Sequence, residues 1–245
     1  MKNAIVIGAS SGIGEGFVRK LVREGYRVGM TGRRTVEMKR IRDEVGEDNA
    51  LIREMDVTKT EEARKIFKSL TNEMAKDGGI VDMVVISAGV GKNNSMADWE
   101  ISEWTNGVNV VGFTAIADAA IELFQKQKKG SLVGLSSIAG IKGIGDAPVY
   151  SASKGYERLY LEAAKQYFMK HRLDVNVTAV LPGFVDTELV KDNDRMFWVQ
   201  PVEKAVDQAY AGIIKGKFYV VVTKRWRLMA WIMRALPRWV WFRAC

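Results

Sequence analysis

Short apolar runs alternate with helix-spaced segments along most of this chain, and this alternation limits the possible fold more than any other feature. The first run, Asn3 to Gly8, is rich in β-branched residues and continuously apolar, as in a strand buried on both faces. After Gly12, apolar residues recur at the helical spacing of Ile13, Phe17 and Leu21. The chain is therefore expected to begin with a strand, a glycine-rich turn and a helix.

The same unit recurs to about residue 223 and predicts seven strands. The six further strands are expected at Arg27–Thr31, Ala50–Met55, Val81–Ser87, Gly130–Ser136, Val175–Leu181 and Phe218–Thr223. The later helices are expected at Val36–Val45, Thr60–Ala75, a long segment ending near Lys129, Ala152–Lys170 and Val202–Lys215. Repeated strand–helix units predict one parallel sheet covered by helices on both faces, because each right-handed crossover returns over a face. No linker divides residues 1–223, so we expect one domain followed by a tail, 224–245.

Composition excludes several classes of protein and localises the charge. With 47% apolar and 27% charged residues, the chain is neither disordered nor a disulfide scaffold. The net charge of +8 comes entirely from residues 208–245, which hold eight Lys and Arg and no acid, whereas the other 29 basic residues are matched by 29 acidic ones. The basicity therefore belongs to the tail, and nucleic acid is not an expected partner.

Cysteine and histidine are too few for a disulfide or a metal site. The single cysteine, Cys245, has no partner in the chain, and no charged and apolar leader precedes Asn3. These features predict a cytoplasmic protein. The single histidine, His171, follows an expected helix end, and there is no cluster of His, Cys or paired carboxylates, so no metal site is predicted.

The turn between the first strand and the first helix has the composition of a phosphate-binding loop. Small residues in Gly8-Ala-Ser-Ser-Gly-Ile-Gly14 allow backbone N–H groups and the positive helix end to approach a pyrophosphate. We expect a dinucleotide to contact Gly8, Ser10, Ser11, Gly12, Ile13 and Gly14. The alternative is a tight strand-to-helix turn that binds nothing.

The end of the second strand favours NADP(H) over NAD(H). An acidic residue there would accept the ribose hydroxyl of NAD, but this chain has Arg33 and Arg34, which suit a 2′-phosphate. The alternative is that both arginines only solvate a loop. Asp56, at the end of the third strand, either accepts the adenine amino group or caps the next helix, a position for which Thr58 competes.

Tyr150 and Lys154 have a spacing that suits acid–base chemistry. Four residues apart, they share one face of a helix if the helix has begun by Tyr150. Lowering the tyrosine pKa from about 10 towards 7 requires about 4 kcal/mol of preferential phenolate stabilisation, which a nearby cation in a dry cleft can supply. Tyr150 would then protonate a carbonyl oxygen or deprotonate an alcohol. Taken alone, this spacing is common by chance.

Together, these motifs resemble those of the short-chain dehydrogenase/reductase family. The resemblance runs from about Asn3 to Thr223 and rests on the Gly8, Gly12, Gly14 turn, Asp56-Val57, Ser87-Ala-Gly89, Asn109, Ser136-Ser137, Tyr150 with Lys154, and Pro182-Gly183 followed by Thr187. It implies a single-domain Rossmann fold with a doubly wound parallel sheet of seven strands in the order 3-2-1-4-5-6-7. It also implies a nicotinamide cofactor and a homodimer or homotetramer.

The resemblance assigns roles to a catalytic tetrad. Tyr150 is the expected acid–base, and Lys154 is expected to bind the nicotinamide ribose and lower the tyrosine pKa. Ser137 is expected to polarise the substrate oxygen, with Ser136 as the rival, and Asn109 to hold a proton-relay water. Further cofactor contacts are implied at Asp56, Val57, Ala88, Gly89, Tyr150, Lys154, Pro182, Gly183, Val185 and Thr187. The chain departs from the family at Ser87, where an asparagine that braces the sheet is usual.

The implied substrate site is apolar. The resemblance places its walls at Val90 and Gly91, at Ala139–Ala147, and in the loop Phe184–Val199, which contains Leu189, Val190, Met196, Phe197 and Trp198. We therefore expect an NADP(H)-dependent interconversion of a bulky apolar ketone and its secondary alcohol. An acyl-carrier-protein ketoreductase would have the same chemistry with an acidic protein partner. A non-catalytic NADPH-binding or membrane-tethered module is disfavoured by the intact tetrad, and a nucleotide-sugar epimerase by the short chain.

The tail is basic and rich in tryptophan, with four of the seven tryptophans after residue 225. On a helix, its arginines cluster on one narrow face and leave an apolar arc of Trp226, Met229, Ala230, Met233, Leu236 and Val240, while Pro237 should break the helix. Such a helix is too short and too charged to span a bilayer but suits its surface, with the arginines towards anionic lipid. The alternative is that the same arc packs on the core or on a second subunit.

Overall fold

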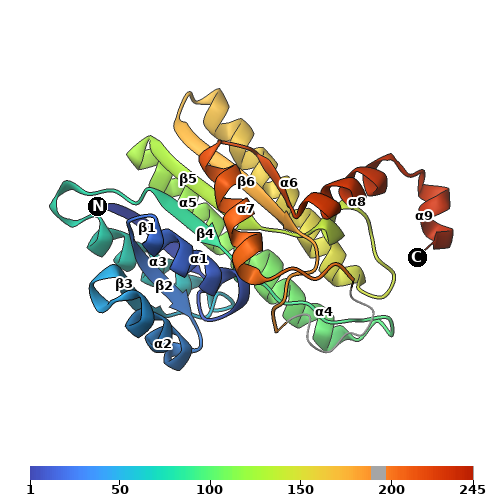
Figure 1. Ribbon diagram of the computed structural model, residues 1–245, viewed down its shortest axis with the longest axis horizontal. Helices are drawn as coiled ribbons and strands as arrows, with labels where there is room; N and C mark the ends of the chain where they lie inside the picture. The colour runs from blue at the N-terminus through green and yellow to red at the C-terminus, as the bar shows by residue number, and fades with distance from the viewer. Residues whose placement is uncertain (189–196, 245) are drawn as a thin grey trace.

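The computed structural model, described for residues 1–188 and 197–244, contains a seven-stranded parallel sheet in the order β3-β2-β1-β4-β5-β6-β7 (Figure 1). The strands are β1 (Lys2–Ile7), β2 (Tyr26–Gly32), β3 (Ala50–Glu54), β4 (Met83–Ile86), β5 (Lys129–Leu135), β6 (Asp174–Pro182) and β7 (Tyr219–Val222). This order confirms the predicted fold.

Helices cover both faces of the sheet. One face packs against α1 (Gly12–Arg23), α2 (Thr35–Val45) and α7 (Val202–Ile214), and the other against α3 (Thr60–Met74), α5 (Phe113–Gln127) and α6 (Pro148–Lys170). Ile7 at the end of β1 is level with Thr31 of β2 on one side and Ile86 of β4 on the other. The strand order reverses at β1, so the connections that follow β1 and β4 lead to opposite sides of the sheet. Ligands of open parallel sheets bind in the crevice formed at such a point.

The predicted long helix before β5 is confirmed but contains a wider turn. It consists of α4 (Trp99–Asn106), a π-helical segment η3 (Gly107–Gly112) and α5. This continuous segment is long and apolar enough to cross a membrane by length and composition alone. Its inner face is part of the protein core, however, where Phe113, Ile116 and Phe124 are buried.

Helix α6 begins early enough to carry both Tyr150 and Lys154. Pro148 occupies its first turn, where a proline is favoured because its fixed φ suits the helix and no N–H partner is lost. The helix therefore starts four residues before the predicted Ala152. This start satisfies the condition under which Tyr150 and Lys154 share a helix face.

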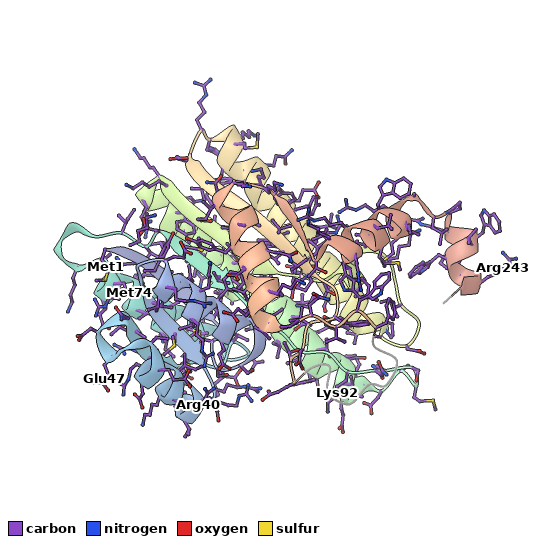
Figure 2. All side chains as sticks on the ribbon, in the orientation of Figure 1. Met1, Arg40, Glu47, Met74, Lys92 and Arg243 are labelled. Carbon is purple, nitrogen blue, oxygen red and sulfur yellow. The ribbon has the colours of Figure 1, made fainter. Side chains whose placement is uncertain are left out.

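The tail forms two helices, α8 (Lys224–Ala235) and α9 (Arg238–Ala244), separated at Pro237 as predicted. Trp226, Ala230 and Met233 of the predicted apolar arc are buried, and the first two belong to the core cluster beside α5 and α6. Most of that arc therefore faces the protein's own core, and the expectation that these residues face a membrane is wrong. Figure 2 shows other side chains extending outward from both helices, with Arg243 at the far end.

Candidate active site

The predicted cofactor residues lie after the carboxyl ends of five strands. They are Gly8, Ser10, Ser11, Gly12, Ile13 and Gly14 after β1, Arg33 and Arg34 after β2, Asp56 and Val57 after β3, Ala88 and Gly89 after β4, and Pro182, Gly183, Val185 and Thr187 at and after β6. Parallel strands bring these ends to one edge of the sheet. Segments up to about 180 residues apart in the chain thus form one site.

The glycine turn is tight because backbone atoms fill the space that side chains would need. Gly8 has a φ of +81°, which suits glycine, and a Cβ there would lie 2.6 Å from the backbone nitrogen of Ala88. A Cβ at Gly14 would lie 2.0 Å from the carbonyl oxygen of Gly8. These contacts hold the start of α1 directly over the ends of β1 and β4.

The start of α1 fits a pyrophosphate. Ser11 is the N-cap residue, but its side chain makes no capping hydrogen bond, so the first-turn N–H groups have no side-chain acceptor. Such N–H groups and the positive helix end bind anions. A Cβ at Gly12 would lie 3.1 Å from Cγ2 of Thr187, which places the loop after β6 opposite the turn.

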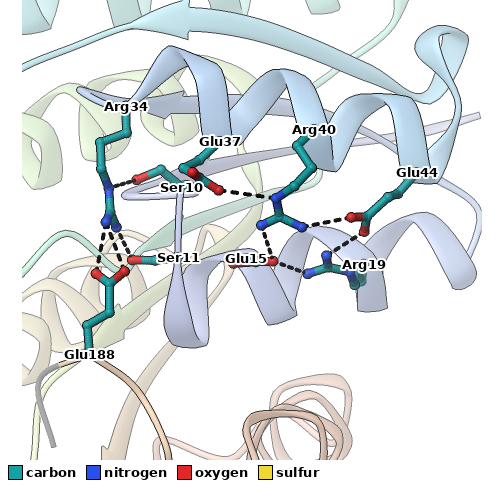
Figure 3. Close-up of polar contacts among 9 residues, drawn as sticks. All are labelled: Ser10, Ser11, Glu15, Arg19, Arg34, Glu37, Arg40, Glu44 and Glu188. Carbon is teal, nitrogen blue, oxygen red and sulfur yellow. Dashed lines mark hydrogen bonds and ion pairs between the residues drawn. The ribbon is translucent and has the colours of Figure 1, made fainter. Parts of the chain in front are cut away.

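Arg34 reaches across the glycine turn, as Figure 3 shows. Its guanidinium donates hydrogen bonds to the hydroxyls of Ser10, at 3.4 Å, and Ser11, and forms an ion pair with Glu188 at 2.9 Å. Arg34 is therefore already held beside the turn, where a phosphate on the adenine ribose would compete with Glu188. Sequence reasoning missed Glu188, because 154 residues separate it from Arg34.

Asp56 follows the end of β3 and accepts two hydrogen bonds from Thr58. Burial opposes its ionisation, but hydrogen bonds from Thr58 and the charge of Arg33 keep the pKa of Asp56 below its usual value. Thr58 donates both its hydroxyl, at 2.7 Å, and its N–H, at 3.0 Å, to the Asp56 carboxylate. Neither residue caps α3, whose N-cap is Lys59 without a side-chain hydrogen bond, so the capping alternative for Asp56 is wrong.

Tyr150 and Lys154 lie together at the centre of this edge. The Tyr150 ring packs on the backbone of Gly91, where a Cβ would lie 2.6 Å from the ring carbon Cδ2. The Lys154 ammonium is 5.9 Å from the centre of the Tyr150 ring. A Cβ at Gly89 would lie 3.0 Å from Lys154 Nζ, so the loop after β4 approaches both residues closely.

The two neighbouring serines have different partners. Ser136 donates its hydroxyl to the backbone oxygen of Lys154 at 2.7 Å, so it fastens β5 to α6. The Ser137 hydroxyl accepts the N–H of Ala139 at 3.1 Å and lies 3.5 Å from the carbonyl oxygen of Pro182. Because the first hydroxyl is committed to the backbone of α6, Ser137 remains the candidate for contact with a substrate.

Asn109 braces the loop after β4. It is fully buried in the π-helical segment, and its side chain accepts the N–H of Val90 at 2.9 Å and donates to the Val90 oxygen at 2.8 Å. It also donates to the hydroxyl of Ser153 at 3.0 Å. These contacts tie the loop after β4 to α6, beside Lys154. Single π-helical turns within α-helices are frequently found at functional sites.

Glu157 is a neighbour of the catalytic candidates that sequence reasoning missed. Lys154 Nζ donates to both Glu157 carboxylate oxygens, at 2.9 and 3.0 Å, and to the Leu135 carbonyl at 3.0 Å. Burial lowers the pKa of Lys154, but Glu157 and Tyr150 outweigh it and raise that pKa, whereas burial raises the pKa of Glu157 to about 7. The spacing of three residues on a helix was the available signal.

An aromatic cluster lies beyond β6. Its members are Phe184, Phe197, Trp198 and Trp226, with ring centres 5.2 to 5.7 Å apart. A Cβ at Gly183 would lie 2.2 Å from the Trp226 indole, so this glycine is required by the tail helix as well. The predicted wall residues Leu189, Val190 and Met196 lie outside the described residues.

The edge therefore brings together a turn that fits a dinucleotide and a tyrosine–lysine pair. The model of the short chain dehydrogenase family matches residues 2–197, and the chain belongs to this family. It is 34% identical over 220 residues to an uncharacterized oxidoreductase of Myxococcus xanthus, covering 88% of this chain and 85% of that one.

Solved structures share the fold. One is of a 7beta-hydroxysteroid dehydrogenase, with a TM-score of 0.81 and 21% identity over 96% of this chain and 92% of that one. Another is a short-chain dehydrogenase from Sphingobium yanoikuyae in complex with NADPH, with a TM-score of 0.79 and 19% identity over 96% of this chain and 94% of that one. At these identities the likeness concerns the fold.

Proposed function

We propose that this protein is an NADP(H)-dependent oxidoreductase that interconverts a carbonyl and a secondary alcohol on an apolar substrate. The observation that supports it most is the placement of Tyr150 and Lys154, with Ser137, beside a turn that fits a dinucleotide pyrophosphate. The NADPH-bound relative agrees with this cofactor. The site lies at the diverging strand ends where this fold binds ligands.

The chain's own residues would handle the proton and the substrate oxygen. NADPH, when bound, supplies the hydride that adds to the carbonyl carbon. Tyr150 donates the phenolic proton to the carbonyl oxygen, and the Ser137 hydroxyl donates a hydrogen bond to the same oxygen. The Lys154 ammonium stabilises the phenolate that Tyr150 becomes until solvent returns the proton. In alcohol oxidation Tyr150 accepts the proton instead.

The aromatic cluster supports an apolar substrate. It follows β6, and the Ser137 hydroxyl lies 3.5 Å from the carbonyl oxygen of Pro182 at the end of that strand. The relative that acts on hydroxysteroids has a substrate of this kind. We expect purified protein to oxidise NADPH with bulky apolar ketones and much more slowly with sugars or acyl thioesters. Activity confined to acyl thioesters would instead favour a ketoreductase of carrier-bound acyl chains.

Arg34→Asp should weaken NADPH binding by roughly 10- to 100-fold and leave NADH binding little changed. The substitution removes a guanidinium beside Ser10 and Ser11 and adds a second carboxylate near Glu188, which repels the 2′-phosphate. Fluorescence titration with each cofactor measures the effect. Lys39→Asp, with the same charge change at an exposed position of α2, is the control. Equal affinity of the unaltered protein for NADPH and NADH would show that the arginines do not select the cofactor.

A further inference from the structure

The tail helix α8 has two apolar faces, and only one of them is used by the core. Trp226, Ala230 and Met233 face the protein and are at most 4% exposed. Leu228, Trp231 and Ile232 follow the same helical spacing on the opposite side and are exposed, Trp231 at 66%. No element of the described chain covers the large apolar side chains of this second face.

Helix α9 also carries large exposed apolar side chains. Trp239 and Phe242, three residues apart, are 64% and 74% exposed. We call Leu228, Trp231, Ile232, Trp239 and Phe242 the outer face. Figure 1 shows that α8 and α9 extend away from the sheet, with the C-terminus at the end of α9. Large exposed apolar patches of this kind mark an interaction surface.

The side-chain charge of the tail is of one sign. The tail contributes six cations, Lys224, Arg225, Arg227, Arg234, Arg238 and Arg243, and no carboxylate side chain. Among the described residues, none of these six cations forms an ion pair. Two copies meeting through this face in a two-fold dimer would oppose six cations to six. A second copy is therefore a poor partner, whereas an anionic surface is a good one.

We propose that the outer face binds the surface of an anionic lipid bilayer, with its indole, phenyl and aliphatic groups in the interfacial layer and its arginines among the headgroups. Tryptophan favours this layer because its ring is apolar and its N–H is polar. Leu228 and Ile232 are stabilised when their aliphatic side chains insert into the apolar part of the bilayer. The lysine and arginine side chains of the tail add electrostatic attraction to acidic headgroups. This inference concerns residues other than the predicted arc and does not depend on the reaction.

The contacts of the tail place such a bilayer beside the substrate loop. Lys142 donates to the carbonyl oxygen of Leu236 at 2.6 Å, and the Trp241 indole donates to that of Gly143 at 2.7 Å. Lys142 and Gly143 both belong to the loop that follows Ser137 and begins with η4 (Ile138–Ile141). An apolar substrate dissolved in the lipid would therefore meet the protein at its proposed substrate side.

Co-sedimentation of the full chain with vesicles tests the proposal. We expect binding to phosphatidylglycerol vesicles at low salt to exceed binding to phosphatidylcholine vesicles about tenfold or more, and to weaken in about 1 M salt. The triple variant Trp231→Ser, Trp239→Ser, Phe242→Ser should stay in the supernatant. A matched triple variant, Val36→Ser, Met169→Ser, Ile214→Ser, removes equally exposed apolar side chains elsewhere and should bind like the unaltered protein.

Two results would overturn it. The first is equal sedimentation of the unaltered protein and the outer-face variant, which would mean that charge alone or another surface is responsible. The second is no binding by the unaltered protein together with a change of oligomeric state in the outer-face variant by light scattering, which would assign the face to a second copy. Circular dichroism of each variant shows that the fold is retained.

A separate observation concerns the buried pair Lys154–Glu157. Lys154 and Glu157 are 5% and 1% exposed, and both carboxylate oxygens of Glu157 bind the one ammonium. Lys154 also donates to the Leu135 carbonyl at 3.0 Å, and its ammonium lies 5.9 Å from the centre of the Tyr150 ring. The ammonium that would stabilise a Tyr150 phenolate is thus shared with a second anion.

Resting on the proposed function, we infer that Glu157 is a positioning residue that holds Lys154 in place and weakens the electrostatic field of its ammonium at Tyr150. A carboxylate beside the ammonium partly cancels the field that favours the phenolate. Glu157→Gln removes the negative charge but keeps the size and shape of the side chain, so it should favour the phenolate of Tyr150. Burial keeps the pKa of Glu157 near 7, so the effect would develop across neutral pH.

The pH dependence of kcat/KM for alcohol oxidation tests this inference. In Glu157→Gln, the acidic limb of the kcat/KM profile should move down by about one pH unit. The reason is that the substitution removes a carboxylate of the same charge as the Tyr150 phenolate. Glu157→Asp keeps the charge and should keep the limb near its original pH. Glu162→Gln, on the same helix but bonded to Tyr219, is the control.

A second readout does not need the reaction. The phenolate absorbance of Tyr150, taken as the difference between Glu157→Gln and the same variant carrying Tyr150→Phe, should titrate at a lower pH than the corresponding difference in the unaltered protein. An unchanged titration would overturn the role of Glu157 whatever the enzyme does. A shifted titration in a protein that reduces no carbonyl would retain that role and reject the proposed function.

Discussion

Tyr150→Phe should lower kcat by at least about 100-fold while leaving the affinity for NADPH nearly unchanged. The substitution removes one hydroxyl and its proton, whereas the ring that packs on Gly91 remains. Proton transfer is then lost, but the turn around Gly8 and Gly12 that fits the cofactor is untouched. Steady-state rates with a substrate found in the ketone panel, and NADPH titration by fluorescence, measure the two effects separately.

Tyr156→Phe is the matched control for this experiment. It makes the same change six residues along the same helix, where the hydroxyl bonds to Thr114 at 2.8 Å on the protein surface. We expect its turnover to stay near that of the unaltered protein. Near-normal turnover of Tyr150→Phe would show that another group is the acid and would reject the proposed mechanism.

Trp226→Ala should lower the free energy of unfolding by about 3–5 kcal/mol. The indole is 2% exposed and packs against Gly183 and the rings of Phe184 and Phe197, so truncation leaves a cavity beneath α8. Its Nε1–H has no hydrogen-bond partner among the described residues, so the loss comes from packing. Unfolding in urea, followed by circular dichroism, measures the change.

Trp231→Ala removes the same side chain from the opposite face of the same helix. Because Trp231 is 66% exposed, its loss should change the free energy of unfolding by no more than about 0.5 kcal/mol. Equal stability of the two variants would mean that α8 is not docked through Trp226. The pair of variants also separates the core-facing side of the tail from the outer face proposed to bind lipid.

Neighbouring residues along the chain were sufficient to predict the fold and much of the candidate site. Local patterns include the apolar strands, the glycine turn at Gly8 and the spacing of Tyr150 and Lys154. Such patterns can be recognised in the sequence without knowing which segments pack against them. The strand order came from the family resemblance and is confirmed by the sheet. The family itself is likewise confirmed by the match over residues 2–197.

Contacts between distant segments could not be obtained in this way. Arg34 and Glu188 meet because the ends of parallel strands share one edge, and no local pattern relates them. The different partners of Ser136 and Ser137 depend on where α6 lies against β5.

The tail shows most clearly what sequence and tertiary structure each decide. Periodicity alone established a basic, amphipathic helical segment broken at Pro237, because helix formation and proline geometry are properties of the chain itself. It could not establish which apolar stripe is buried, since Trp226 and Trp231 lie on opposite faces and both are apolar. Only the shape of the surface against which α8 packs, with Gly183 leaving room for the Trp226 indole, decided that one stripe joins the core and the other faces outward.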